Sequence, residues 1–413
     1  MKKIVIIVIA IVVVLLVVLQ LLRPKFAENR FNEGKIFLDS ARYTEAIAKF
    51  DRAIWLNKKV PVYFNSRGVA RSGLNEDSLA LQDYNTAIGL NSEVSDFYLN
   101  RGITYRKLNI FESSMNDLNK AIELDDSNSS AYYNRGLLNA SMMNFDESVK
   151  DYNRSIELDG TNLEAFYSRG ESRAHLNDFM GAINDYDKLI EGTGATAENY
   201  KKRGVFKQNI QDYEGAEKDL TQASLLEQKD KEIFFYLAQS KFNLNKLDES
   251  IDNLNKALKL DPDYDAAYSV RGGAFLKKGD FKASIKDFNK AIELNNSYLK
   301  AYYGRGIAKA FSQDYKGSIG DFNKVIQLDK NYAQAYYNRA VSNAILGNHK
   351  AALPDYDYII AKDPRYAEAY YNRGISRMNL KDSKGACEDF HMALSLGYEQ
   401  AKPMVKMYCP EKK

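Results

Sequence analysis

Residues suited to catalysis or metal binding are few in this chain, and they are scattered. It has two cysteines, Cys387 and Cys409, and three histidines that lie far apart in the sequence, His175, His349 and His391. The sequence contains no Ser/His/Asp or Cys/His arrangement, no HExxH and no GxxxxGKS or GxxxxGKT motif. We therefore expect no enzyme, no cofactor, no bound metal and no small-molecule substrate.

Arginine and aspartate, in contrast, recur with a fixed spacing. Nine arginines follow one another at intervals of 34 residues or twice 34, and an aspartate lies 16 residues after each. Two further positions of this pattern change together, to Glu33 with Lys49 and to Leu237 with Asn253. Because each arginine has an acid of its own, we expect structural ion pairs and no nucleic-acid binding. The pairs include Arg67 with Asp83, Arg101 with Asp117, Arg135 with Asp151, and Arg373 with Asp389.

These pairs belong to a 34-residue repeat that occurs eleven times over residues 27–400 without insertion or deletion. Apolar, aromatic or small residues lie at repeat positions 4, 8 and 11 and again at 20, 21, 24, 27 and 28, which is helical spacing. Each repeat is therefore predicted to be two antiparallel helices joined by a short turn. The predicted repeats are 27–60, 61–94, 95–128, 129–162, 163–196, 197–230, 231–264, 265–298, 299–332, 333–366 and 367–400, and a capping helix and tail follow in 401–413.

The repeat resembles that of the tetratricopeptide repeat (TPR) family, which has a 34-residue helix–turn–helix unit. The resemblance rests on Tyr or Phe at position 4, Gly at 8, Ala or Ser at 20, a large apolar residue at 24 and Ala at 27. It departs from the family at position 7, where Arg replaces the usual Leu, and at position 32, where proline occurs only as Pro262 and Pro364. The resemblance implies an all-α, right-handed superhelical solenoid whose concave groove binds peptides or proteins.

In the family's geometry, positions 2, 5, 9 and 12 of each repeat face the groove. In the last three repeats these positions are mostly aromatic or aliphatic, and Asn follows Tyr at position 6 in two of them. Such a wall suits an extended peptide or an amphipathic helix. Alternatively, each Tyr packs on the neighbouring repeat, and the protein is a structural spacer or assembly component of an envelope complex without a groove ligand. The predicted groove residues are Tyr303, Ile307, Tyr337, Asn338, Val341, Tyr371, Asn372, Ile375 and Met378.

The N-terminus, residues 1–25, is predicted to be a transmembrane anchor. Residues 4–22 form an apolar run with one polar residue, Gln20, and Arg23-Pro24-Lys25 ends the run. As a helix the run is about 28 Å long, close to the thickness of the hydrocarbon core of a bilayer. The alternative is a cleaved signal peptide, but the run is longer than the apolar part of such a peptide and no small-x-small cleavage site follows it. We expect a single-pass membrane protein.

The charges near this run give a weak indication of orientation. The net charge is +3, and the first 25 residues carry +4 without any acid, so the rest of the chain has no overall basic field. Charges on the two sides of the run nearly balance, so the positive-inside rule barely decides. Because a short basic N-terminus before an apolar run resembles an export signal, we expect the repeats on the outer, periplasmic side, with the cytoplasmic side as the alternative.

The two cysteines have different interpretations on the two sides of the membrane. Cys387 lies at repeat position 21, which elsewhere is mostly Ile, Leu or Val, and Cys409 lies in the expected capping helix and tail. On an oxidising outer side, a Cys387–Cys409 disulfide would fasten the cap to the last repeat. Otherwise Cys387 is a small buried apolar side chain.

Overall fold

A computed structural model of the protein describes residues 2–193 and 195–409, and over these residues the chain is all-helical, without strands. Residue 1 of the predicted anchor, residue 194 of the fifth repeat and residues 410–413 of the predicted tail lie outside the described residues. The helices form two compact parts, an N-terminal segment up to Ala195 and a C-terminal segment from Thr196 onward. Each segment is considered by itself below.

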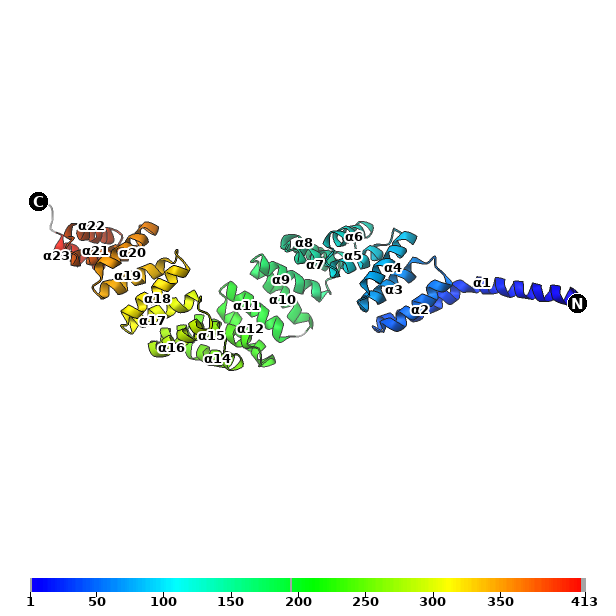
Figure 1. Cartoon of the computed structure of the whole chain (residues 1–413), viewed down its shortest axis with the longest axis horizontal. Coiled ribbons are helices and arrows are strands. Elements are labelled where there is room, and N and C mark those ends of the chain that lie inside the picture. The colour runs from blue at the N-terminus through cyan, green and yellow to red at the C-terminus, as the bar shows by residue number, and fades with distance from the viewer. Residues whose placement is uncertain (1, 194, 410–413) are drawn as a thin grey trace. The chain divides into compact units, whose positions relative to one another are not determined.

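In the N-terminal segment, successive helices pack on one another, and the first helix of each repeat also contacts the first helix of the next (Figure 1). This is the helix-pair stacking that the repeat predicts. Its helices are α1 (Lys2–Asp39), α2 (Tyr43–Leu56), α3 (Pro61–Gly73), α4 (Asp77–Leu90), α5 (Ser95–Lys107), α6 (Phe111–Leu124), α7 (Ser129–Ser141), α8 (Phe145–Leu158), α9 (Leu163–His175) and α10 (Phe179–Thr193).

The C-terminal segment is built in the same way and ends in the predicted cap, a short 3-10 turn followed by a two-turn helix. Its helices are α11 (Ala197–Asn209), α12 (Tyr213–Leu226), α13 (Lys231–Asn243), α14 (Leu247–Leu260), α15 (Asp265–Lys278), α16 (Phe281–Leu294), α17 (Leu299–Phe311), α18 (Tyr315–Leu328), α19 (Ala333–Ile345), α20 (His349–Lys362), α21 (Ala367–Asn379), α22 (Ser383–Ser395), η1 (Glu399–Ala401) and α23 (Lys402–Tyr408).

Each helix pair closes around a small residue in its first helix and a large one in its second. A β-carbon placed on Gly68 would lie only 2.6 Å from the ring of Tyr84, and that ring is fully buried. The missing side chain therefore lets the two backbones approach while the ring fills the space between them. This contact explains why positions 8 and 24 of the repeat are restricted to small and large residues.

The turn between the two helices of a repeat uses the left-handed backbone region. The residue at position 15 has a positive φ in all eleven repeats, from Ala41 in the first to Lys381 in the last. Only two of these residues are glycine, Gly279 and Gly347, although glycine adopts this conformation with the least strain. Four others are asparagine, which also tolerates this region, so the packing of the helices must impose the hairpin geometry on the remaining five.

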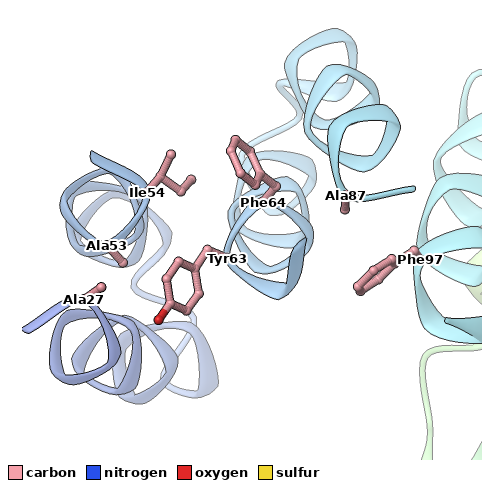
Figure 2. Packing of buried hydrophobic residues seen from close by; sticks show 7 residues of the cluster. All are labelled: Ala27, Ala53, Ile54, Tyr63, Phe64, Ala87 and Phe97. Atoms are coloured by element: carbon pink, nitrogen blue, oxygen red, sulfur yellow. The ribbon is translucent and has the colours of Figure 1, made fainter. Parts of the chain in front are cut away.

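The hydrophobic core runs from one repeat to the next instead of closing within each. One cluster joins Ala27 of α1, Ala53 of α2, Tyr63 of α3, Ala87 of α4 and Phe97 of α5 (Figure 2). These side chains are all at most 5% exposed. A single repeat would leave half of such a cluster in water, so its burial depends on the neighbouring repeats.

The helix that begins in the apolar run does not end with it, because α1 continues through Pro24 as one helix of 38 residues. Proline removes one backbone donor and crowds the carbonyl one turn earlier. On its N-terminal side the helix is strongly apolar, and on its C-terminal side it packs on α2, so helix is favoured on both sides of the proline.

One stretch of α1 is long and apolar enough to cross a bilayer, namely Ile6–Asp39, with a mean hydropathy of 3.1 over its most apolar part and no burial there. A signal sequence near an N-terminus has the same character. The membrane anchor is therefore carried forward as a proposal.

Candidate binding groove

The arginines and aspartates singled out by their spacing lie in contact in the structure. In the four pairs named from the sequence, the Arg nitrogen and the Asp oxygen are 2.5–2.7 Å apart, and each Asp side chain is at most 8% exposed. Lys49 and Glu33, the pair with exchanged charges, also form an ion pair. A buried carboxylate with a bidentate guanidinium partner fixes the two helices of a repeat against each other.

Most of these arginines also reach the preceding repeat, a contact that the sequence reasoning missed. Arg101 donates from Nη1 to Asn85 Oδ1 at 2.7 Å, and its guanidinium lies 5.6 Å from the ring centre of Tyr98. The hydrogen bonds that Arg101 donates to Asp117 raise the pKa of Arg101. The signal was readable, because an Asn or Asp recurs at position 25 in most repeats. In seven other repeats the arginine at position 7 donates in the same way to position 25 of the preceding repeat. The acceptors are Asp51, Asn119, Asn153, Asn255, Asn289, Asn323 and Asp357.

The three groove tyrosines predicted in the last repeats pack on other tyrosines, and two of them are tied to the following repeat by hydrogen bonds. Asn338 donates to the hydroxyl of Tyr303 at 3.1 Å, and Asn372 donates to that of Tyr337 at 2.9 Å. These are the contacts that the alternative, packing on the neighbouring repeat, requires. The ring pairs, with the distances between ring centres, are Tyr303–Tyr332 at 5.0 Å, Tyr337–Tyr366 at 5.2 Å and Tyr371–Tyr398 at 5.0 Å.

The hydroxyls of Tyr303 and Tyr337 stay protonated over the physiological pH range. Burial raises the pKa of Tyr303, and burial together with the neighbouring Glu368 carboxylate raises that of Tyr337. Both hydroxyls are therefore neutral groups that can donate and accept hydrogen bonds. They are half-buried, so part of each ring remains accessible.

A hollow of about 550 Å³ lies beside two of these tyrosines. It opens between the first helices α17 and α19 and the second helix α20. Its surface is aromatic and aliphatic, with amides and one pair of opposite charges at its edge. The lining residues are Tyr303, Ala333, Gln334, Tyr337, Asn338, Ile359, Lys362, Asp363 and Tyr366.

A larger hollow of about 1030 Å³ adjoins the first at Tyr303 and extends over the first helices α11, α13, α15 and α17. Ile307 also lines it, whereas Val341, Tyr371, Asn372, Ile375 and Met378 line neither hollow. The larger hollow thus lies over the sixth to ninth repeats, whereas the predicted groove residues lie in the ninth to eleventh. Its residues include Val205, Gln208, Phe235, Tyr236, Phe242, Val270, Gly273, Leu276, Phe288, Tyr298 and Lys300.

This larger hollow arises where side chains are small. In the eighth repeat, the groove positions 5 and 9 are Ser269 and Gly273. A β-carbon on Gly273 would lie 3.8 Å from the ring of Phe242, which is an ordinary contact distance, and both residues line the hollow. The sequence contained this signal, since most other repeats carry larger residues at position 5, but a search for apolar side chains passes over it.

The lining of the larger hollow is nearly uncharged. Lys300 is its one charged residue, and Gln208 is already engaged, donating to Tyr236 O at 2.6 Å and to Ser240 Oγ at 2.7 Å. The surface therefore offers rings, aliphatic groups and amides for binding. Over the described residues, no three His, Cys, Asp or Glu side chains lie together in a way that could hold a metal ion.

At the C-terminal end, Cys387 of α22 and Cys409 after α23 are joined by a disulfide, with their Cα atoms 5.4 Å apart. Ala401 of the cap is fully buried, and Tyr398 packs on Tyr371. The disulfide therefore links the cap covalently to the last repeat. The alternative left open by the sequence was that Cys387 is a small buried apolar side chain.

Sequence profiles described as TPR repeat and tetratricopeptide repeat match residues 95–128, 129–162, 238–279, 272–310, 303–367 and 346–397. Together they cover more than half of the chain, and both helical segments contain matched repeats. The chain belongs to the tetratricopeptide repeat family. Its fold is typical of protein–protein interaction scaffolds, which are commonly non-catalytic. No curated protein matches the chain at a significant level.

Solved structures with similar helical repeats have low sequence identity to the chain. YrrB, described as a TPR protein with an unusual peptide-binding site, is 22% identical, with a TM-score of 0.43 over 46% of this chain and 98% of its own. A tetratricopeptide repeat protein from Parabacteroides merdae is 20% identical (TM-score 0.45, 60% and 99% covered). Yeast Tom70 is 14% identical (TM-score 0.41, 92% and 95% covered). These likenesses are of fold, and no partner is inferred from them.

Proposed function

We propose that this TPR protein is a non-catalytic scaffold that holds a peptide segment of a partner protein in the groove of its C-terminal segment. The observation that carries the proposal is the pair of hollows that meet at Tyr303 and together span the sixth to tenth repeats. Their lining of rings, aliphatic side chains and amides is the kind of surface on which peptides bind.

The lining also indicates the character of the bound segment. Lys300 in the larger hollow and the Lys362 and Asp363 pair in the smaller one are the only charged lining residues. A strongly charged segment would lose its hydration there without gaining partners. The expected ligand is therefore an apolar, aromatic-containing segment of low net charge.

We further propose that the apolar part of α1 anchors the scaffold in a membrane, with the repeats on the outer side. The length and composition of the helix support the anchor, and the Cys387–Cys409 disulfide supports the outer side. Disulfides persist in oxidising compartments, whereas the cytosol keeps thiols reduced.

A spacer without a groove ligand is the second candidate, and one observation favours it. Tyr303 and Tyr337 each pack on a second tyrosine and accept a hydrogen bond from the next repeat, so these rings have a structural role already. In that function the hollows would stay empty, and the repeats would serve only to set a distance from the membrane.

Peptide selection against the full-length protein in detergent micelles separates the two candidates. Random peptides displayed on phage would be selected on the wild-type protein, and the enriched sequences synthesised for affinity measurements. Gly273→Leu places a side chain in the larger hollow, and we expect it to weaken binding about tenfold or more. Gly320→Leu is the matched control, because Gly320 lies on the second helix α18 with no atom within 4 Å of an added β-carbon.

The scaffold is supported if apolar peptides are enriched, bind the wild type and the Gly320→Leu variant equally, and bind the Gly273→Leu variant poorly. It is contradicted if no peptide is enriched, or if Gly273→Leu leaves the affinities unchanged while both variants keep their helical content. The first of these contrary results is the one that the spacer predicts.

A further inference from the structure

The one tryptophan of the chain lies exposed on α2, beside the point of α1 at which the apolar run ends. Trp55 is near the C-terminal end of α2 and 66% exposed, which is unusual for so large an apolar side chain. The guanidinium of Arg23, the first residue after the apolar run, lies 5.7 Å from the centre of the Trp55 ring. The ring is therefore level with the point at which α1 would leave a membrane.

The packing of α1 on α2 fixes this level. Ala27 of α1 lies in the same buried cluster as Ala53 and Ile54, near the end of α2 (Figure 2). Because α2 runs antiparallel to α1, the loop that follows α2, residues 57–60, lies beside the stretch of α1 just after the apolar run. This loop is thus the part of the first repeat nearest to the proposed membrane.

The same end of the repeat is basic and partly apolar. Lys58 and Lys59 of the loop are exposed, as are Arg23 and Lys25 of α1, and none of the four forms an ion pair with another described residue. Phe26 is 49% exposed on the same stretch of α1. Acidic Glu28 lies one turn further from the apolar run, so the net charge of this end is positive.

We propose that this end of the first repeat, the basal patch of Arg23, Phe26, Trp55, Lys58 and Lys59, binds the headgroup layer of an anionic phospholipid membrane. The inference rests on the proposed anchor and adds a second, surface contact to it. Aromatic rings favour the interface between hydrocarbon and water, and exposed Lys and Arg close to it attract anionic headgroups. Because α1 is one continuous helix, insertion of its apolar part brings the patch to this layer without any rearrangement.

The basal patch would determine how the first repeat is held relative to the bilayer surface. A helix anchor alone attaches the first repeat to the membrane through one helix segment, which contains Pro24. Contact of Trp55 and the loop lysines with headgroups adds a second point of attachment on the other side of the helix pair. The first repeat is then held against the bilayer surface and not suspended away from it.

The fluorescence of Trp55 tests the proposal directly, because the chain has no other tryptophan. The full-length protein would be reconstituted into phosphatidylcholine vesicles with and without phosphatidylglycerol, and isolated by flotation. Lipids with a spin label at the headgroup or at the middle of the acyl chain would serve as quenchers. We expect headgroup labels to reduce the emission about twofold, mid-chain labels to have little effect, and phosphatidylglycerol to strengthen the quenching.

A matched control moves the tryptophan along the same helix. The double variant Trp55→Phe, Ile36→Trp places the fluorophore on α1, 13 residues beyond Arg23, at a side chain that is 67% exposed in the wild type. Along a helix this is about 20 Å further from the apolar run. We expect no quenching of this variant by either label. A second pair of changes, Lys58→Gln with Lys59→Gln, is expected to abolish the effect of phosphatidylglycerol.

The outcomes separate the patch from the anchor. If the protein does not float with the vesicles, the proposed anchor is wrong and the basal patch fails with it. If it floats but Trp55 is quenched no more than the tryptophan at position 36, the anchor stands and the patch is overturned. A third outcome also overturns the patch: lipid labels do not quench Trp55, yet Trp55 is shielded from aqueous iodide to an extent that depends on protein concentration. This outcome assigns the face to contact with a second copy of the chain.

Discussion

In the eighth repeat, Arg271 donates to Asp287 of its own repeat at 2.6 Å and to Asn255 of the seventh at 2.6 Å. In the seventh repeat, the residue at the same position is Leu237, which is 4% exposed and packs on Leu220 of the sixth. The two repeats thus make the same junction to their predecessors, one through charges and hydrogen bonds and the other through apolar contact.

The difference shows what the charged pair contributes. A buried ion pair often stabilises a fold no more than a well-packed apolar pair of similar size, because desolvation offsets much of the attraction. In the seventh repeat Asn253, the partner position, instead donates to the carbonyl of Glu249 in its own helix at 2.7 Å. The charged pair is therefore one of two workable arrangements at positions 7 and 23, and its removal is costly only when one of the two charges is left behind.

Removing the acid alone is expected to have the largest effect. Asp287→Ala leaves the guanidinium of Arg271 without its buried partner, so we expect the free energy of unfolding to fall by about 3–5 kcal/mol. Asp287 is 4% exposed, so water cannot readily replace the lost carboxylate. Urea unfolding of the full-length protein, followed by circular dichroism, measures the change.

The double variant Arg271→Leu, Asp287→Asn copies the seventh repeat and serves as the control. Because it removes both charges, its free energy of unfolding should lie within about 2 kcal/mol of that of the wild type. If the double variant were as unstable as Asp287→Ala, the two junctions would not be interchangeable and the comparison between the repeats would be wrong.

A smaller effect is expected where the repeats differ inside the hairpin. The seventh repeat combines Ala238 with Leu254, whereas the ninth combines Gly306 with Phe322. A β-carbon on Gly306 would lie 2.8 Å from the ring of Phe322, which is fully buried. Gly306→Ala should therefore destabilise the protein by about 1–3 kcal/mol through overpacking, measured by urea unfolding.

Adding Phe322→Leu to Gly306→Ala should recover part of this loss, because it copies the seventh repeat. The tenth repeat already has Ala340 beside a large ring, Tyr356, so a ring can shift to accept the methyl group. Gly306→Ala is accordingly expected to weaken packing without preventing folding. If Gly306→Ala were as stable as the wild type, the space between position 306 and the ring of Phe322 would not limit the packing of this hairpin.

These examples also show how far the sequence predicts the molecule. Periodicity gave the helix pairs, and the joint change of positions 7 and 23 indicated a contact, because covariation of two residues at a fixed distance has few other causes. The acceptor at position 25 was missed because it lies in another repeat. Continuity of α1 through Pro24 was missed because local helix rules take no account of packing on both sides.

The predicted groove residues coincide with the hollows only in part, for a physical reason. Apolar side chains at groove positions identify a surface that could bind, and Tyr303, Ile307, Tyr337 and Asn338 do line the hollows. A hollow, however, is made by the side chains that are absent. The small residues Ser269 and Gly273 decide its depth, and their effect emerges only when neighbouring helices are stacked.

The smallest expected effect is on pH dependence, and it separates repeats by the residue at position 24. Burial raises the pKa of Tyr356 in the tenth repeat, whereas the seventh and eighth have the non-ionising Leu254 and Phe288 at that position. In the unfolded chain a tyrosine titrates near its ordinary pKa of about 10, so above that pH the unfolded state loses its proton first. Stability from Tyr356 is therefore complete below about pH 10 and falls as the pH rises further.

Comparison of the wild type with Tyr356→Phe isolates this contribution. At one pH unit above the ordinary value, ionisation of the unfolded tyrosine lowers stability by about 1.4 kcal/mol, and phenylalanine is exempt from this loss. We expect the stability of Tyr356→Phe relative to the wild type to rise by about that amount between about pH 9 and pH 11, as measured by urea unfolding at each pH. An unchanged difference would mean that water reaches the Tyr356 hydroxyl, so that this repeat is packed less tightly than its fully buried ring indicates.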